Sequence, residues 1–444
     1  MPGSKITFLI AVAVAAAIYF LTPYDPALRT GLAVLALVAI LWMTETFHIT
    51  VTALLIPVLA VLTGIFSTAD ALKNFANPII FLFLGGFALA AALNEQGLDR
   101  YISTHVLRIA RGRLGAAAML LFVTAAGLSM WISNTATTAM MLPLVLGLLK
   151  QLPYEDNKRT YWFVLLGLAY SASIGGIGTM VGSPPNAIAA AAVGLTFLDW
   201  LKIGLPIVIV SFPLMILILW LVMRPDLNHH FEQAEDHEKL NGAQWATLGV
   251  FGLTVCLWLF SSPISKLVGV TKGFDALVAV FAILMLCMLK LVTWKAVEKS
   301  ADWGVLLLFG GGLTLSAMLK ETGTSLFLAN GISDMLHGAP MVLFILVVAA
   351  FVVMLTEIAS NTASSALLVP IFVGIAGAMG MPEVVMAMVI AVAASCAFML
   401  PVATPPNAIV YGSGAVPQSQ MMRAGVVLNA AMTAVITAAA MMML

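Results

Sequence analysis

The sequence predicts an all-α polytopic membrane protein that is built from two inverted-topology repeats. Three observations lead to this fold class: the composition, the length of the apolar runs and an internal repetition. Of the 444 residues, 62% are hydrophobic and 9% are charged, whereas about a quarter of the residues in a soluble domain are charged. So little polar surface cannot cover a particle in water, and we therefore expect a lipid bilayer around the chain. The formal net charge of zero gives no indication of nucleic acid as a partner.

Apolar runs that are long enough to cross a bilayer recur along the whole chain. A transmembrane helix needs about 20 such residues. The sequence predicts eleven spans, at Ile6–Leu21, Thr30–Met43, Thr50–Phe66, Pro78–Leu93, Tyr161–Val181, Ile203–Met223, Trp245–Phe260, Ala276–Leu289, Trp303–Leu319, Glu383–Val402 and Ala424–Leu444. The first span follows a short basic start and also fits a signal peptide, but the ten spans after it favour a retained helix.

Two further apolar stretches, Leu114–Leu149 and Pro340–Met379, are too long for one crossing. Each carries a polar cluster at its middle, which predicts a re-entrant helical hairpin with a polar tip. Such a tip is tolerated at membrane depth only where it is buried in protein or lines a cavity. The alternative is two ordinary helices with a polar turn at a surface, but such a turn is usually charged or rich in glycine.

The basic residues predict the orientation of the chain. With a cytoplasmic N-terminus and with both hairpins returning to their own side, fourteen Lys and Arg fall in cytoplasmic segments and six fall outside. Because short cytoplasmic loops are enriched in basic residues, the sequence predicts an inside N-terminus and an outside C-terminus.

Three sequence blocks occur twice in the same order. Residues 82–97 (LFLGGFALAAALNEQG), 133–144 (SNTATTAMMLPL) and 183–188 (SPPNAI) match residues 308–323 (LFGGGLTLSAMLKETG), 360–371 (SNTASSALLVPI) and 404–409 (TPPNAI). The copies are 221 to 227 residues apart. Five predicted crossings separate equivalent points, and because five is odd, the copies must face opposite ways. Inverted repeats with a binding site at their interface are typical of transporters.

This repetition divides the chain into three parts. Residues 1–224 contain the N-terminal segment and the first repeat, with a hairpin at 114–149 and a broken helix at 182–186. Residues 225–243 form a cytoplasmic linker, whose His229, His230 and His237 we interpret as solvated rather than as a metal site. Residues 244–444 contain the second repeat, with a hairpin at 340–379 and a broken helix at 403–407. Residues 99–112 and 323–337 are predicted to be amphipathic surface helices.

A Ser-Asn-Thr motif lies at the middle of each predicted hairpin. A single motif of this kind often marks a helix N-cap, but two copies at equivalent positions in apolar hairpins indicate a function, because buried polar groups in lipid are costly. Asn134 and Asn361 each offer a carbonyl oxygen and an NH₂ group, so each can face a cation and a carboxylate. The hydroxyls of Ser133, Thr135, Ser360 and Thr362 can bind either ligand.

A Pro-Pro pair follows each motif and should interrupt a span midway. Proline removes a backbone donor and disfavours helix in the residue before it. Ser183 and Thr404 then stand where they can cap a new half-helix, whose N-terminus favours anions. The carbonyl groups that are left free near Gly182 and Ala403 suit a hard cation.

No Lys, Arg or His occurs in Leu114–Leu149, Tyr161–Trp200 or Pro340–Gln420. A dianion that binds there has no protein cation as a partner, and an isolated buried charge is very costly. A mobile cation must therefore supply positive charge, and sodium fits a set of hydroxyl, amide and carbonyl oxygens. Protons fit less well, because Glu357 is the only acidic residue beside either motif and can equally be structural.

The paired Ser-Asn-Thr motifs and the two Pro-Pro breaks resemble the divalent anion:sodium symporters, also called the INDY family, over nearly the whole chain. The resemblance implies one sodium site at Ser129, Ser133, Asn134 and Gly182, and a second at Thr356, Ala359, Asn361 and Ala403. It implies that the substrate is held by Asn134, Thr135, Ser183, Asn361, Thr362, Thr404 and Pro405. It also implies a homodimer in a bacterial inner membrane, with an elevator-like domain that carries both hairpins.

The resemblance predicts sodium-coupled symport of a C4-dicarboxylate such as succinate, malate or fumarate. An exchanger of two dicarboxylates remains an alternative within transport, and citrate, tartrate and sulfate remain alternative substrates. A membrane-embedded enzyme would need a nucleophile, a base or a metal cluster at membrane depth. The motif regions contain no His and one Cys, so we expect no enzyme activity.

Overall fold

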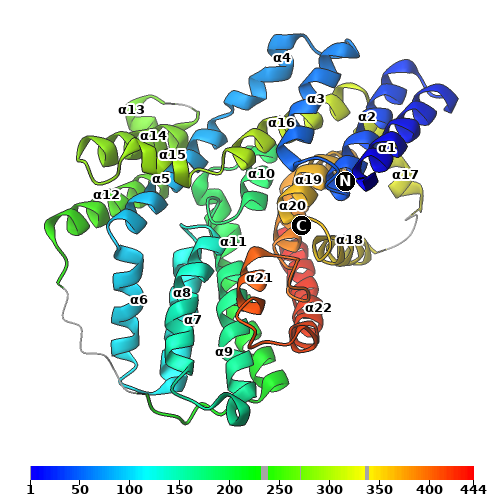
Figure 1. The fold of residues 1–444 in the computed structure, drawn as a ribbon. Coiled ribbons are helices and arrows are strands. Elements are labelled where there is room, and N and C mark those ends of the chain that lie inside the picture. The colour runs from blue at the N-terminus through cyan, green and yellow to red at the C-terminus, as the bar shows by residue number, and fades with distance from the viewer. Residues whose placement is uncertain (1, 232–238, 271, 336–339) are drawn as a thin grey trace.

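The computed structural model describes residues 2–231, 239–270, 272–335 and 340–444 (Figure 1). All the regular elements in these ranges are helices, and no strand is formed in them. Seven of these helices are long and apolar enough to cross a membrane, and seven shorter helices are also apolar. The predicted all-α class of a polytopic membrane protein is thereby confirmed.

The first part of the chain consists of these helices: α1 (Pro2–Leu21), α2 (Pro26–Met43), α3 (Ile49–Leu62), α4 (Thr68–Leu72), the 3₁₀ turn η1 (Lys73–Ala76), α5 (Pro78–Glu95), α6 (Leu98–Ile109), α7 (Leu114–Ser129), α8 (Asn134–Leu149), α9 (Tyr154–Gly175), α10 (Pro184–Val193) and α11 (Phe197–Met223). The second part consists of α12 (Gly242–Leu259), α13 (Ser261–Val268), α14 (Phe274–Met288), α15 (Trp294–Ser300), α16 (Trp303–Glu321), α17 (Thr324–Met335), α18 (Met341–Thr356), α19 (Asn361–Ala378), α20 (Glu383–Ala394), α21 (Pro405–Tyr411) and α22 (Gln418–Met443).

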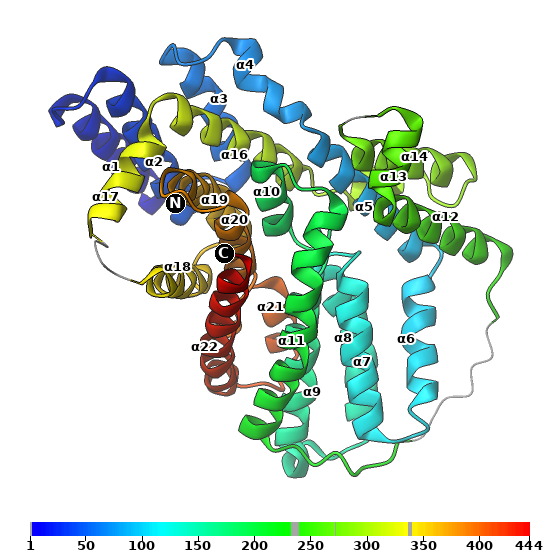
Figure 2. The ribbon, with the colours of Figure 1, turned by 180° about the vertical axis from the view of Figure 1, so that it is seen from behind.

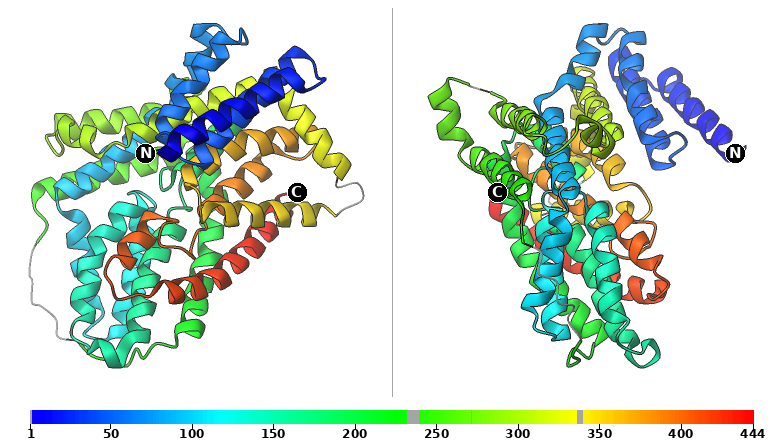
Figure 3. Two further views of the ribbon diagram at one scale, coloured as in Figure 1. Left: turned by 45° about the vertical axis from the view of Figure 1, so that its right-hand side comes forward. Right: turned by 60° about the vertical axis from the view of Figure 1, so that its left-hand side comes forward.

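The helices form three groups in space. Helices α6, α7, α8 and α9 lie side by side, and α12, α13 and α14 form a group next to α5 (Figures 1 and 2). Helices α1, α2 and α3 lie at the opposite margin, where α2 contacts α16, α17 and α19 (Figure 3). Large apolar side chains at the periphery are exposed, among them Leu62 at 78% and Met288 at 80%. Their exposure is the arrangement that a lipid-facing surface requires.

The order of helices α5 to α11 recurs as α16 to α22, and the matching sequence blocks fall on matching helices. Each long apolar stretch forms two helices around a polar tip: α7 and α8 flank residues 130–133, and α18 and α19 flank residues 357–360. The predicted surface helices also form, as α6 and α17. We name residues 130–133 the first tip and residues 357–360 the second tip.

The two Pro-Pro pairs follow long unwound segments. Helix α9 ends at Gly175 and α20 ends at Ala394, before the predicted spans do, and residues 176–183 and 395–404 are not helical. We name these segments the first loop and the second loop. Helix resumes at Pro184 and at Pro405, because proline at the first helical position needs no amide partner. Gly175, Gly176 and Gly178 weaken helix at the start of the first loop.

The linker between the halves is described only in part, and His237 lies outside the described residues. His229 Nε2 lies 3.5 Å from Asp226 Oδ2. Among the described residues, no group of three His, Cys, Asp or Glu side chains is placed to hold a metal ion.

Candidate functional site

Each half of the molecule packs its half-helix against the hairpin of the other half. Helix α10, which follows the first loop, contacts α19 and α20. Helix α21, which follows the second loop, contacts α8 and α9. The residues that introduce these half-helices, Ser183 and Thr404, therefore lie between the two hairpins, where the sequence predicts the substrate.

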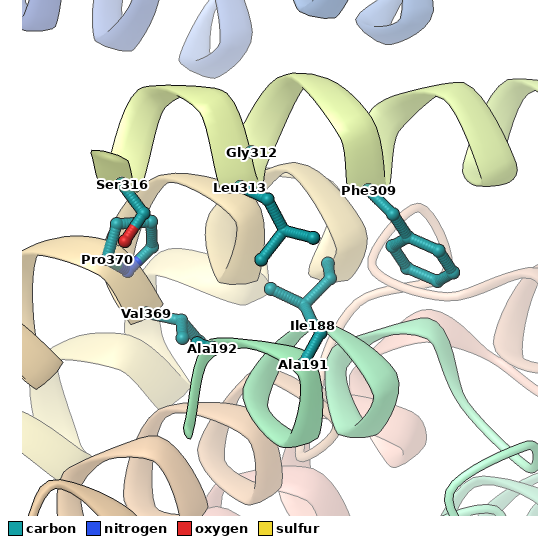
Figure 4. Close-up of a pocket in the computed structure, with 9 residues that line it drawn as sticks. All are labelled: Ile188, Ala191, Ala192, Phe309, Gly312, Leu313, Ser316, Val369 and Pro370. Atoms are coloured by element: carbon teal, nitrogen blue, oxygen red, sulfur yellow. The ribbon is translucent and has the colours of Figure 1, made fainter. Parts of the chain in front are cut away.

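The packing of α10 is apolar and dense. Ile188 of α10 faces Leu313 and Phe309 of α16, beside Val369 and Pro370 of α19 (Figure 4). The gap between these helices is about 10 Å³, which is the space of about one water molecule. This contact is a packed interface and not a ligand site.

The first tip brings together most of the residues that the resemblance assigns to the first sodium site. Ser129 Oγ donates to Asn134 Oδ1 over 2.5 Å. A Cβ atom at Gly176 would lie 2.4 Å from Asn134 Oδ1, and one at Gly182 would lie 2.5 Å from Gly176 O and 3.0 Å from Ser129 O. Carbonyl and amide oxygens thus converge where two glycines leave room, which suits a small cation.

Ser133, the fourth residue of the predicted first sodium set, caps a helix. Its Oγ accepts a hydrogen bond from Ala136 N over 3.2 Å and caps α8. Ser360 does the same for α19, where the distance from Ala363 N is 3.5 Å. The N-cap interpretation and the functional interpretation of the Ser-Asn-Thr motif are therefore compatible, because the serine caps the helix and leaves the asparagine to the site.

The second tip repeats the main contact of the first. Thr356 Oγ1 lies 2.5 Å from Asn361 Oδ1 and 2.9 Å from Ala394 O. Ala359 and Ala403 are both buried, and each donates its amide to the chain before it, to Leu355 O and Leu400 O. Of the predicted second sodium set, the structure joins Thr356 and Asn361 directly and leaves the other two residues close to the same tip and loop.

The predicted substrate residues differ in exposure. Thr135 and Pro405 are exposed, Asn134, Asn361 and Thr362 are half-buried, and Ser183 and Thr404 are buried. In the described part of the chain, no hydrogen-bond partner contacts the Thr135 or Thr362 hydroxyl group. Both hydroxyls are thus available to a ligand.

The predicted caps of the two half-helices are only half correct. Thr404 Oγ1 accepts from Asn407 N over 3.3 Å and caps α21. Ser183 makes no such bond at α10; its Oγ lies 3.5 Å from Ser395 Oγ in the second loop. Ser183 is therefore turned toward the other half, which the local sequence does not indicate.

The asparagines after the two Pro-Pro pairs have a role that the sequence analysis missed. Asn186 Nδ2 donates to Gly176 O over 2.8 Å and to Thr179 O over 2.7 Å. Asn407 Nδ2 donates to the equivalent Ala397 O and Leu400 O over 3.1 and 3.0 Å. The Oδ1 atoms of both asparagines are buried and lack a hydrogen-bond partner among the described residues. The repeated Pro-Pro-Asn sequence was the signal for this pair.

Glu357 is resolved as a structural partner of the second loop. Its carboxylate accepts from the backbone amides of Phe398, Met399 and Leu400 over 2.8, 2.9 and 3.0 Å. It also accepts from Asn429 Nδ2 of α22 over 2.6 Å. The Glu357 side chain therefore ties the second tip to the second loop and to α22.

A cavity of about 490 Å³ adjoins the first tip. Ser133 and Thr137 line it on the side of the hairpin, and Asn94 and Glu95 of α5 and Lys299 of α15 line it on the opposite side. The cavity is large enough for a small organic anion with its water.

Comparison with known proteins identifies the family. The family model described as citrate transporter matches residues 39–391. An uncharacterized transporter of Haemophilus influenzae is 53% identical over 92% of this chain and 90% of its own length, and one of Methanocaldococcus jannaschii is 38% identical over 93% of both chains. The sodium-dependent dicarboxylate transporter SdcS of Staphylococcus aureus is 31% identical over 90% of this chain and 82% of its own length. The chain is therefore a transporter and not an enzyme, and it belongs to the divalent anion:sodium symporter family that its paired motifs predicted.

Proposed function

We propose that the protein is a sodium-coupled symporter of C4-dicarboxylates such as succinate, malate and fumarate. The observation that carries this proposal is the pair of matched, neutral oxygen sets, Ser129 with Asn134 and Thr356 with Asn361. Because the hairpins and the half-helices lack Lys, Arg and His, a dianion that binds between them needs cations from solution. The name of the SdcS relative supports both the ion and the substrate class.

The substrate binds between the two tips in this proposal. Thr135 and Thr362 each hold one carboxylate, with Asn134, Asn361, Ser183, Thr404 and Pro405 around them. The two sodium ions bind at the oxygen sets of the tips, where unwound backbone carbonyls assist, as in other transporters with broken helices. The cavity beside Ser133 gives access from the side of α5 and α15.

The wider architecture is part of the same proposal. The two halves form inverted repeats, residues 1–224 and 244–444, which are joined by the cytoplasmic linker 225–243. The protein is a homodimer in a bacterial inner membrane, with its N-terminus in the cytoplasm. The hairpins, with their half-helices, move as one elevator-like body. The crossed packing supports this unit, because α10 contacts α19 of the second hairpin and α21 contacts α8 of the first.

The experiment is uptake of labelled succinate into proteoliposomes, with an inward sodium gradient or with choline in its place. We expect concentrative uptake with sodium and none with choline. Full uptake in a sodium-free proton gradient would contradict sodium coupling. Uptake that depends on internal dicarboxylate and not on sodium would identify an exchanger instead.

The substrate class is tested in the same vesicles by competition. Unlabelled fumarate and malate should compete with succinate, and butyrate should not. The family model is described as a citrate transporter, so citrate is included, with tartrate and sulfate. Stronger competition by citrate than by succinate would move the proposal to tricarboxylates.

A further inference from the structure

In each half, a polar side chain holds the loop to its own hairpin tip. The loop supplies a donor side chain in the first half, and the tip supplies an acceptor side chain in the second half. In the first half the loop supplies the side chain. Thr179 Oγ1 donates to Met130 O of the first tip. The same oxygen accepts from Gly182 N over 3.1 Å. Thr179 thus connects the tip to one of the proposed sodium ligands.

In the second half the tip supplies the side chain. Glu357 stands at the position of Met130, and Leu400 stands at the position of Thr179. Glu357 accepts from Leu400 N over 3.0 Å, and Ala403 N donates to Leu400 O over 3.2 Å. Both halves thus connect the tip to a proposed sodium ligand. In the first half a hydroxyl group donates to a backbone carbonyl group, and in the second half a carboxylate accepts from backbone amides.

The surroundings of Glu357 contain donors and no described cation. Its four partners are three backbone amides and Asn429 Nδ2. All four are donors, and they match a carboxylate, whose oxygens accept hydrogen bonds. Tyr170 is close by, but its hydroxyl contacts Phe398 O over 2.6 Å. The side chain is 2% exposed. The first tip has no acid at this position, so only the second tip carries a buried carboxylate of its own.

We propose that Thr179 and Glu357 are the positioning residues of the two ion sites, and that the carboxylate makes the second site the tighter one for sodium. This inference rests on the proposed function. Neither side chain need touch an ion: Thr179 fixes Gly182, and Glu357 fixes the loop that leads to Ala403. The attraction of the buried carboxylate for a cation adds to the second site alone, because charges interact strongly where water is excluded.

The test compares the half-saturating sodium concentration of succinate uptake in four variants. Thr179→Val keeps the shape and removes both hydrogen bonds, and we expect an increase of about fivefold, which corresponds to two net hydrogen bonds at the low end of their usual strength. Thr179→Ser keeps the hydroxyl and should restore wild-type behaviour. Glu357→Gln removes the charge and should raise the concentration about tenfold or more, since bonds to charged groups are stronger. Asp275→Asn is the control, because Asp275 is another buried carboxylate that accepts a backbone amide, from Phe197 over 2.7 Å.

Succinate affinity at saturating sodium separates positioning from general damage. We expect it to change little in Thr179→Val and Glu357→Gln, and sodium dependence to stay unchanged in Asp275→Asn. The inference is overturned if Thr179→Ser behaves like Thr179→Val. It is also overturned if the wild type requires sodium and neither Thr179→Val nor Glu357→Gln changes the half-saturating sodium concentration. An equal shift in both would remove the claim of unequal sites.

A second measurement decides the matter if Glu357→Gln does not transport. Without substrate, sodium chloride should raise the unfolding temperature of the purified wild-type protein more than choline chloride does. The reason is that an ion that binds the folded state raises its stability. Sodium should stabilise Glu357→Gln less than Thr179→Val. If the wild type neither needs sodium for uptake nor is stabilised by it, the proposed function itself fails, and the inference with it.

Discussion

The two hairpin tips carry the same polar motif but lie in unlike surroundings. Trp131 in the first tip stacks on Phe197 at 5.9 Å between ring centroids and meets Phe251 of α12 edge-on at 5.1 Å. Ile358, at the equivalent position of the second tip, is 76% exposed, and Val402 of the second loop is 83% exposed. Trp131 thus docks the first tip on neighbouring helices, whereas Ile358 of the second tip is uncovered in the described chain.

This difference shows that the repeat preserves polar contacts and not the packing around them. The hydrogen bond to the motif asparagine is 2.5 Å in both halves, while the residue three positions before it is docked in one half and exposed in the other. We name the contacts of Asn134 with Ser129 and of Asn361 with Thr356 the polar centre, and we expect mutations in its two halves to have similar effects. We name Trp131 and Ile358 the apolar margin, and we expect mutations of these two residues to have different effects.

The largest expected effect tests the symmetry of the centre. Asn134→Ala and Asn361→Ala should each weaken sodium and succinate binding together, because coupling between two ligands is reciprocal. Each change removes a proposed ion ligand together with the hydrogen bond to Ser129 or Thr356, at a cost of about 3 kcal/mol, or about a hundredfold in the apparent constants. Sodium and succinate dependence of uptake measure both. Loss of succinate affinity with wild-type sodium dependence in either variant would show that the asparagine does not serve both ligands.

The next effect tests the asymmetry of the margin. Trp131→Ala should lower the stability of the purified protein by about 2 kcal/mol, since it removes aromatic contacts with three rings. Ile358→Ala should change stability by less than about 0.5 kcal/mol, as exposed substitutions do. Thermal unfolding in detergent measures both variants. Equal losses would mean that the second tip is covered by a partner, such as a second copy of the chain.

A smaller effect is expected at the threonines of the two motifs. Thr135→Val and Thr362→Val keep the side-chain shape and remove one hydroxyl, so each should raise the half-saturating succinate concentration about fivefold, which is about 1 kcal/mol. Butyrate should hardly compete in the wild type, because one half of the site would keep unpaired polar groups. An unchanged constant in both variants, or equal inhibition by butyrate and succinate, would contradict the two-carboxylate model.

The smallest effect distinguishes the two half-helices. Thr404→Ala removes the cap of α21 and should cost about 1 kcal/mol of stability without substrate. Ser183→Ala removes no cap and should cost a few tenths of a kcal/mol, about the size of other neutral substitutions. Thermal unfolding of the two purified variants in sodium-free buffer compares them. A larger loss in Ser183→Ala would show that its contact with Ser395 is the stronger one.

The helices could be predicted from the sequence because lipid imposes a simple rule on length and hydropathy. Where an apolar run is continuous, the prediction agrees closely with the structure, as for α14 (predicted Ala276–Leu289, observed Phe274–Met288). The ends of α9 and α20 were missed, since apolar residues fill the unwound loops as well. These loops are stabilised by Asn186, Asn407 and Glu357, whose partners lie seven or more residues away.

The central residues of the candidate site could be predicted because their motif occurs twice in the sequence. The repeat pointed to Asn134 and Asn361, and their contacts with Ser129 and Thr356 followed the resemblance. The orientation of Ser183 toward Ser395 was not predictable, because it depends on how α10 crosses to the other half. Thr179 was also missed, since its second-half counterpart is an apolar Leu400 and the repeat therefore gave no signal.

The exchange of half-helices between the halves has a mechanical consequence. A tip that shifted alone would pull the half-helix packed on it, and that half-helix begins at the loop of the other tip. The two proposed ion sites are therefore coupled by the packing of the half-helices, without a relay of side chains between them. This crossed packing resists separate opening of either hairpin, so under the proposed function both hairpins would move together around a bound anion.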